Sequence, residues 1–145
     1  MSTPTPQACY RTHFSAAHIL WSADLSEAQN HALYGPCARL HGHNYELEVA
    51  VSGSVDPGTG MAVNFAEIGE IVQQQVIEPC DHHRLETDVP CLEGVITTAE
   101  NLAAAFWARL EPAIAELGRP EAPVRLERLR LFETHEYFVE LTREP

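Results

Sequence analysis

The residues best suited to chemistry lie at 37–49, CARLHGHNYELEV, where one cysteine and two histidines precede an apolar alternation. Side chains alternate along a β-strand, so His41 and His43 point the same way, roughly 7 Å apart along the chain. Gly42 places no side chain between them. The apolar residues from Tyr45 onward share the parity of the two histidines. Both imidazoles therefore begin the face of the strand that becomes the core side.

Two converging imidazoles at the end of an apolar face suit a borderline metal such as zinc. The alternative is that His41 and His43 are ordinary surface histidines at the entrance to a strand. The HGH triplet alone leaves both interpretations open, so other residues must decide between them.

A third histidine, His18, has a comparable position at the end of an earlier strand. Residues 8–18, ACYRTHFSAAH, alternate as a strand does, and His18 shares the parity of Phe14. The segment 22–36, SADLSEAQNHALYGP, mixes helix formers with turn residues and predicts a mobile loop with one helical turn. The second strand should then run from about residue 43 to residue 53.

Two helices are expected next in the sequence. Asn64 with Glu67 has capping-box spacing, and the helix that it starts should end before Pro79. Thr97 with Glu100 has the same spacing before the second helix. The apolar positions of the two helices repeat at helical intervals, at Phe65, Ile68, Val72 and Val76 and then at Leu102, Phe106, Leu110, Ile114 and Leu117.

Residues 124–132 and 136–141 read as two further strands joined by a tight turn, with a bulge where the parity slips between Leu126 and Leu129. The order of elements is then strand, strand, helix, helix, strand, strand. This order predicts an α+β fold, in which a four-stranded antiparallel sheet carries two helices on one face. A chain of 145 residues with 45% hydrophobic content predicts a single domain over residues 1–145.

The composition restricts the partners. A net charge of −12 argues against a nucleic-acid partner or an anionic membrane surface, because both need a basic stripe. All nine positive residues are arginine, so an anion would be held by guanidinium groups or backbone amides. The first residues show no signal-peptide pattern, and the four cysteines are sparse and lack a CxxC pair. A cytoplasmic protein with free thiols is expected.

Six segments occur in an order typical of one enzyme family, namely FSAAH, CARLHGHNYELEV, GTGMAVNFAEI, CDHHRLETDVP, TTAENLA and LFET. Over about residues 9–141 the chain resembles the 6-pyruvoyl-tetrahydropterin synthase and 6-carboxy-tetrahydropterin synthase family. The resemblance implies the tunnelling fold, in which three subunits pool their sheets into a barrel and two trimers stack as a homohexamer. Its order of strands and helices is the order predicted above.

The resemblance implies that His18, His41 and His43 are the ligands of a catalytic Zn²⁺ ion with a fourth position open for substrate. It makes Cys37 the general base, a thiolate that takes a carbon-bound proton made acidic by the metal. The alternative is that Cys37 is itself a zinc ligand. In that case the four residues would form a closed site in a zinc-stabilised binding module without turnover.

Asp81 and His82 match the proton-relay partners of the base, and His83 has no matched role, so it is interpreted as a surface or packing histidine. On the substrate side, the resemblance makes Glu133 the anchor of the pterin ring, and it places Thr98 and Glu100 beside the pterin. The capping box explains Glu100 without a ligand.

Arg39 is the candidate for holding the phosphates of an anionic substrate, because it lies inside the Cys-to-His loop. The resemblance implies a zinc-dependent lyase that acts on 7,8-dihydroneopterin triphosphate and releases triphosphate. The spacing from Cys37 to the HGH triplet and an arginine-only, bacterial-type composition favour the carboxy branch, which also releases acetaldehyde and supplies queuosine synthesis. The segments GTGM, ETDVP and TTAEN instead resemble the pyruvoyl branch, which serves tetrahydrobiopterin synthesis. This branch is kept as the alternative.

Overall fold

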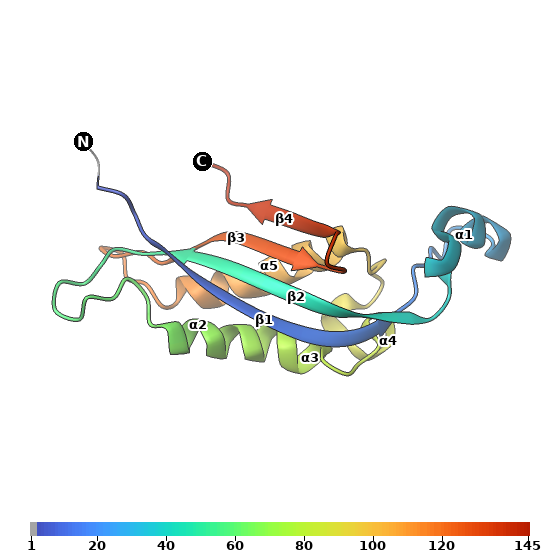
Figure 1. Cartoon of the computed structure of the whole chain (residues 1–145), viewed down its shortest axis with the longest axis horizontal. Helices are drawn as coiled ribbons and strands as arrows, with labels where there is room; N and C mark the ends of the chain where they lie inside the picture. Colours follow the sequence, from blue (N-terminus) through green and yellow to red (C-terminus); the bar gives the residue numbers. More distant parts are fainter. Residues whose placement is uncertain (1–2) are drawn as a thin grey trace.

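The computed structural model describes residues 3–145, and these residues form one four-stranded antiparallel sheet backed by helices (Figure 1). The strands lie side by side in chain order, as β1 (Gln7–His18), β2 (His41–Ser52), β3 (Arg125–Phe132) and β4 (Phe138–Thr142). The helical segments 65–80 and 99–115 lie on one face of the sheet. The predicted α+β class, with a four-stranded antiparallel sheet and helices on one face, is therefore confirmed.

The pairing of β1 with β2 brings three predicted ligands to the same end of the sheet. The two strands pair in register over their whole length, with His18 opposite His41 and Ala16 opposite His43. The second strand begins at His41, two residues earlier than expected, because the pairing with β1 extends to the end of that strand. The histidines thus lie within a regular ladder, which fixes the direction of their side chains.

The connection between β1 and β2 is more helical than the sequence indicated. It contains α1 (Glu27–Tyr34) and the 3₁₀ turn η1 (Gly35–Ala38), and Figure 1 shows α1 beyond the end of the sheet. The prediction of a loop with one helical turn is wrong because Ser26 and Gln29 form a capping box that starts a longer helix. Asn30 is fully buried, and its amide binds the backbone of the preceding turn.

The core lies between the sheet and two helical segments. The first comprises α2 (Phe65–Val72), the π-helical turn η2 (Gln73–Ile77) and α3 (Glu78–Cys80), and the second is α5 (Ala99–Ala115). Two short elements, α4 (Leu85–Asp88) and the 3₁₀ turn η3 (Pro90–Leu92), connect them. Most of the apolar positions predicted to face the core are buried, including Ile68, Val72, Val76, Leu102, Phe106, Leu110 and Ile114.

The first helical segment does not end before Pro79, as predicted, but continues to Cys80. A proline inside an α-helix removes one backbone hydrogen bond and clashes with the carbonyl four residues earlier. Here that carbonyl belongs to Gln75, in the π-helical turn, and it accepts a hydrogen bond of 2.9 Å from Nε of Arg109 on α5. The wider turn and the arginine together accommodate the proline.

The start of α5 is also shifted from the prediction. Thr98, and not Thr97, is the N-cap residue, since its side chain accepts a hydrogen bond from the amide of Asn101. Thr97 is fully buried instead. Glu100 lies exposed in the first turn of the helix, so the expected box between Thr97 and Glu100 is not formed.

The predicted bulge in the third strand is confirmed. Ala50 pairs with Arg128 and Val51 with Leu126, so that Glu127 is the extra residue of β3. The extra residue corrects the parity and leaves Leu126 and Leu129 both buried in the core. Among residues 3–145, no helix is long and apolar enough to cross a bilayer.

Candidate metal centre

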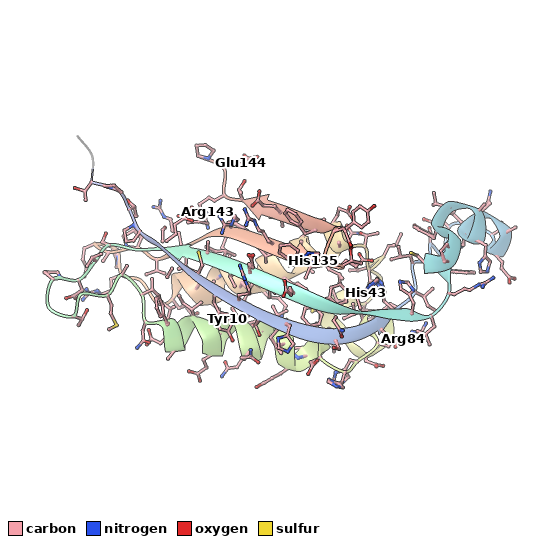
Figure 2. The ribbon with its side chains drawn as sticks, in the orientation of Figure 1. Tyr10, His43, Arg84, His135, Arg143 and Glu144 are labelled. Carbon is pink, nitrogen blue, oxygen red and sulfur yellow. The ribbon has the colours of Figure 1, made fainter. Side chains whose placement is uncertain are left out.

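Four potential metal ligands gather where β1 and β3 end and β2 begins. His18, His41, His43 and Glu133 each offer one ligand atom, and these atoms lie within 4.8 Å of one another. The centroids of the imidazole rings are 4.5 Å apart for His18 and His41 and 5.0 Å apart for His41 and His43. Figure 2 shows His43 on β2 near the turn between β3 and β4.

The sheet explains why Glu133 joins the three histidines. It directly follows Phe132, which pairs with Glu46 of β2, and its backbone amide donates to the carbonyl of Tyr137 at 3.1 Å. Its side chain continues the parity of Leu131, which faces the core. One carboxylate oxygen lies 2.9 Å from Nε2 of His43.

Two of the histidines are oriented through their other ring nitrogen. Nδ1 of His41 lies 2.7 Å from the carbonyl oxygen of Arg39, and Nδ1 of His18 lies 3.0 Å from that of Thr97. A carbonyl only accepts hydrogen bonds, so each Nδ1 carries the proton and each Nε2 keeps its lone pair. This is the arrangement in which metal-binding histidines are usually held.

The residues present fit a metal ion. In the part of the chain that the structure describes, Nε2 of His41 and Nε2 of His43 are buried without a hydrogen-bond partner. The contact of His43 with Glu133 is short enough for an ion pair but lacks hydrogen-bond geometry. Buried polar nitrogens left unpaired are costly, and a cation placed among them would satisfy both.

The electrostatics favour neutral imidazoles, the form that binds metals. Burial, followed by the nearby rings of His41 and His43, lowers the pKa of His18 to about 4. Burial also lowers the pKa of His43, although the carboxylate of Glu133 opposes that shift. Desolvation penalises the charged imidazolium, so at neutral pH these lone pairs are available.

Two residues close to the cluster were missed by sequence reasoning. The hydroxyl of Thr97 lies 3.1 Å from Nδ1 of His18, and the hydroxyl of Tyr45 lies 3.5 Å from Nε2 of the same ring. Tyr45 is fully buried, and this burial raises its pKa. Tyr45 shares the parity of His43 along β2, and this could have indicated that it lies near the cluster. Thr97 was wrongly predicted to be part of a helix cap.

Cys37 lies in η1 and is not one of the four clustered residues among those that the structure describes. Its side chain is half-buried, and its carbonyl accepts a hydrogen bond of 2.8 Å from the amide of Leu20. Glu133 therefore takes the place beside the three histidines that the binding-module interpretation gave to Cys37.

Asp81 and His82 form a pair at the edge of β1. Nδ1 of His82 lies 3.0 Å from one carboxylate oxygen of Asp81, and the other oxygen accepts from the amide of Ser15 at 2.9 Å. The amide of Ser15, and then His82, hold the pKa of Asp81 below its usual value. His82 has φ of +60°, a strained conformation for a residue other than glycine, and its side chain is 83% exposed.

The structure places these candidates in separate groups. Within the described chain, no hydrogen bond joins Cys37 to Asp81 or His82. A surface pocket of about 510 Å³ instead lies beside His82, and it is lined by Ser15, Ala16, Ala17, Gly42, His43, Asn44, His82, His83 and Arg84.

The remaining predicted residues are exposed or make hydrogen bonds that hold the local backbone. The side chain of Thr98 caps α5, and Glu100 is exposed. Arg39 is exposed and supplies its carbonyl to His41. His83 is exposed, with Nδ1 placed 2.8 Å from the carbonyl oxygen of Asp81.

Fold and site together define an α+β protein with a candidate metal centre at one end of its sheet. The sequence model of the family described as 6-pyruvoyl tetrahydropterin synthase matches residues 8–144. The chain belongs to this family, which confirms the resemblance noted in the sequence. The prediction of an enzyme, a lyase of the pterin synthase family, is confirmed with it.

Characterised relatives cover most of the chain. The 6-pyruvoyl tetrahydrobiopterin synthase of Dictyostelium discoideum is 40% identical over 129 residues, which are 89% of this chain and 90% of the relative. The human protein of the same name is 39% identical over 110 residues, or 74% of this chain and 76% of the relative. The structure of Caenorhabditis elegans 6-pyruvoyl tetrahydropterin synthase superposes with a TM-score of 0.85 at 29% identity, covering 99% of both chains.

The lowered pKa of His18 makes the stability of the metal-free protein depend on pH. Below pH 6.5 the unfolded chain binds a proton at His18, whereas the folded protein resists protonation down to about pH 4. Between these values, stability should fall by about 3 kcal/mol as the pH decreases. Urea unfolding of the metal-free protein at several pH values measures this slope. A His18→Gln variant that shows the same slope would contradict the assignment to His18.

Proposed function

We propose that the protein is a zinc-dependent lyase that converts 7,8-dihydroneopterin triphosphate to 6-pyruvoyl-tetrahydropterin with release of triphosphate. The observation that carries the proposal is the buried cluster of three imidazoles and one carboxylate in a chain of this family. The relatives named above are 6-pyruvoyl tetrahydrobiopterin synthases, and they favour the pyruvoyl reaction, which the sequence analysis kept as the alternative. The carboxy branch expected as the main activity has no comparable support.

His18, His41 and His43 would hold the zinc ion, since His18 and His41 are oriented by carbonyls and the Nε2 atoms of His41 and His43 lack other partners. Three imidazoles that leave a position for substrate are typical of a catalytic zinc site. When bound, zinc acts as a Lewis acid that makes a neighbouring carbon-bound proton easier to remove. The lowered pKa values of His18 and His43, caused by burial, agree with this role.

Cys37 is the proposed general base, and Asp81 with His82 would pass the proton onward. The base takes a proton from the side chain of the substrate, electrons move toward the ring, and the triphosphate leaves. The side chain is oxidised as the ring is reduced, so no external redox partner is needed. The low pKa of Asp81 keeps this carboxylate charged beside His82.

A homohexamer of two stacked trimers would reconcile these roles with the separate positions of Cys37 and the Asp81–His82 pair. The open sheet has two edge strands, β1 and β4, which a neighbouring sheet can approach. On β1 the backbone of Ser15 and Ala17 is already paired with the segment 81–84, so a neighbour would pair with the earlier part of that strand. His82 is exposed at the β1 edge. A second copy could therefore bring its own groups to this pair.

Glu133 is proposed to anchor the pterin. Its side chain is 22% exposed, so one oxygen can face His43 while the carboxylate remains open to a ligand. A carboxylate can accept two parallel N–H bonds from the flat edge of the ring. Thr98 and Glu100 remain proposals as pterin contacts. Arg39 is proposed for the triphosphate, because the net charge of −12 requires local positive groups.

Product analysis tests the reaction directly. The purified protein, loaded with zinc, is incubated with 7,8-dihydroneopterin triphosphate under anaerobic conditions. We expect one equivalent of triphosphate and 6-pyruvoyl-tetrahydropterin by mass spectrometry, without acetaldehyde. Acetaldehyde and a 6-carboxy product would establish the carboxy branch instead. Unchanged substrate with zinc bound would indicate a binding module.

Replacing Cys37 by alanine separates a base from a ligand. We expect turnover to fall by about 10²- to 10⁴-fold, the usual contribution of a positioned general base, with zinc content unchanged. Elemental analysis measures the metal and product formation measures the rate. Cys9→Ala is the matched control, because Cys9 is an exposed thiol on β1, and it should behave as the parent protein. Loss of zinc in Cys37→Ala would show that the thiolate is a ligand.

Replacing Glu133 by glutamine keeps the shape of the side chain but removes one acceptor. A donor of the pterin left unpaired costs about 1–3 kcal/mol, so the Kd of a non-reacting pterin should rise about tenfold or more. Calorimetric titration gives this constant, and elemental analysis shows whether zinc is retained. Glu136→Gln, in the exposed turn after Glu133, is the control. Equal constants for Glu133→Gln and the parent protein would exclude Glu133 as the anchor.

A further inference from the structure

Thr97 is a buried polar residue to which the proposed reaction assigns no part. Both it and His18 have no exposed surface. Nδ1 of His18 lies 3.0 Å from the carbonyl oxygen of Thr97 and 3.1 Å from its hydroxyl oxygen. The two residues are 79 positions apart in the sequence, so this contact is made only in the folded chain.

The position of Thr97 is fixed by the start of α5. The side-chain amide of Asn101 donates to the carbonyl of Ile96 at 2.9 Å, and the amide of Thr98 donates to the same carbonyl at 2.8 Å. The hydroxyl of Thr98 caps the helix through the amide of Asn101. The residues on both sides of Thr97 are thus tied to α5.

The two oxygens of Thr97 act differently on the imidazole. The carbonyl cannot donate a hydrogen bond, so a ring with its proton on Nε2 would bring two lone pairs together at 3.0 Å. The carbonyl therefore selects the tautomer, and the hydroxyl shares the Nδ1 proton and limits rotation of the ring. Tyr45 lies on the other side, with its hydroxyl 3.5 Å from Nε2.

We propose that Thr97 is a positioning residue, which holds His18 with its Nε2 lone pair toward His41, His43 and Glu133 and links the metal site to the start of α5. This inference rests on the proposed metal site. His41 is oriented differently, by one backbone carbonyl, that of Arg39, two residues earlier in the sequence. Only for His18, among the described histidines of the cluster, does a hydroxyl side chain next to a helix cap contact Nδ1.

The test compares zinc affinity in variants that keep or lose the hydroxyl. In Thr97→Val a methyl group replaces the hydroxyl, and it needs about 3.5–4.0 Å where the oxygen lies at 3.1 Å, so the ring must move. Competition with a chelator should show zinc affinity about tenfold or more below the parent protein. Thr97→Ser, which keeps the hydroxyl, should restore affinity to within about twofold of the parent protein.

Thr98→Ala is the control for damage to the helix. It removes the side-chain cap of α5 and should lower the melting temperature. Zinc affinity should stay at the parent value, because the amide of Thr98 and the side chain of Asn101 still hold the carbonyl of Ile96. If Thr97→Val binds zinc as the parent protein does, the hydroxyl has no positioning role. If Thr98→Ala loses as much affinity as Thr97→Val, the effect belongs to the helix and the proposal fails.

A measurement without metal distinguishes this proposal from the zinc site itself. Nitrogen-15 spectra of the metal-free protein at pH 7 should show His18 protonated at Nδ1 only, and Thr97→Val should broaden or shift its signals. A proton on Nε2 in the parent protein would overturn the proposal. If the parent protein has the expected tautomer but binds no zinc, the proposed metal site fails while the orientation by Thr97 stands.

Discussion

The site depends on the uninterrupted antiparallel pairing of β1 with β2. Because His18 pairs with His41 and Ala16 with His43, the three imidazoles reach one end of the sheet on its core face. Moving one strand by a single residue would turn the whole set of side chains to the opposite face. Phe14 and Tyr45, which stack with centroids 4.8 Å apart beneath the cluster, penalise such a shift. Core packing and ligand geometry are therefore set by the same register.

The chain after β3 and the segment before α5 each bring one residue to the cluster, Glu133 and Thr97, that β1 and β2 do not contain. The bulge at Glu127 restores the parity of β3, so that its continuation brings the carboxylate of Glu133 next to His43. The start of α5 supplies Thr97 to His18 from the opposite side. The cluster is thus enclosed by elements from both halves of the chain, and burial lowers the pKa of His18 and of His43.

Much of the fold could be predicted from alternation and helical spacing. The parity of His18, His41 and His43 with apolar residues located the cluster, and the parity slip near Leu126 located the bulge. The buried position of Thr97 could not be predicted. The spacing of Thr97 and Glu100 is that of a capping box, and nothing near Thr97 in the sequence indicates that it contacts His18, 79 residues away. The helix in the connection between β1 and β2 is longer than the single turn that was predicted. Its buried Asn30 gains its hydrogen bonds only after the preceding turn has formed, so the sequence does not indicate them. The lack of a hydrogen bond between Cys37 and the Asp81–His82 pair, within residues 3–145, could not be predicted from local pattern either.

The π-helical turn before Cys80 has a consequence for how this protein tolerates changes in length. Such a turn contains about one residue more than an α-helical turn, and each residue of an α-helix turns the chain by about 100°. Loss of one residue between Gln73 and Ile77 would let the segment continue as an ordinary α-helix. Because that α-helix would have one residue fewer, Asp81 would keep roughly its direction toward the amide of Ser15. The π-helical turn therefore lets the chain contain one extra residue here without redirecting the residues that follow.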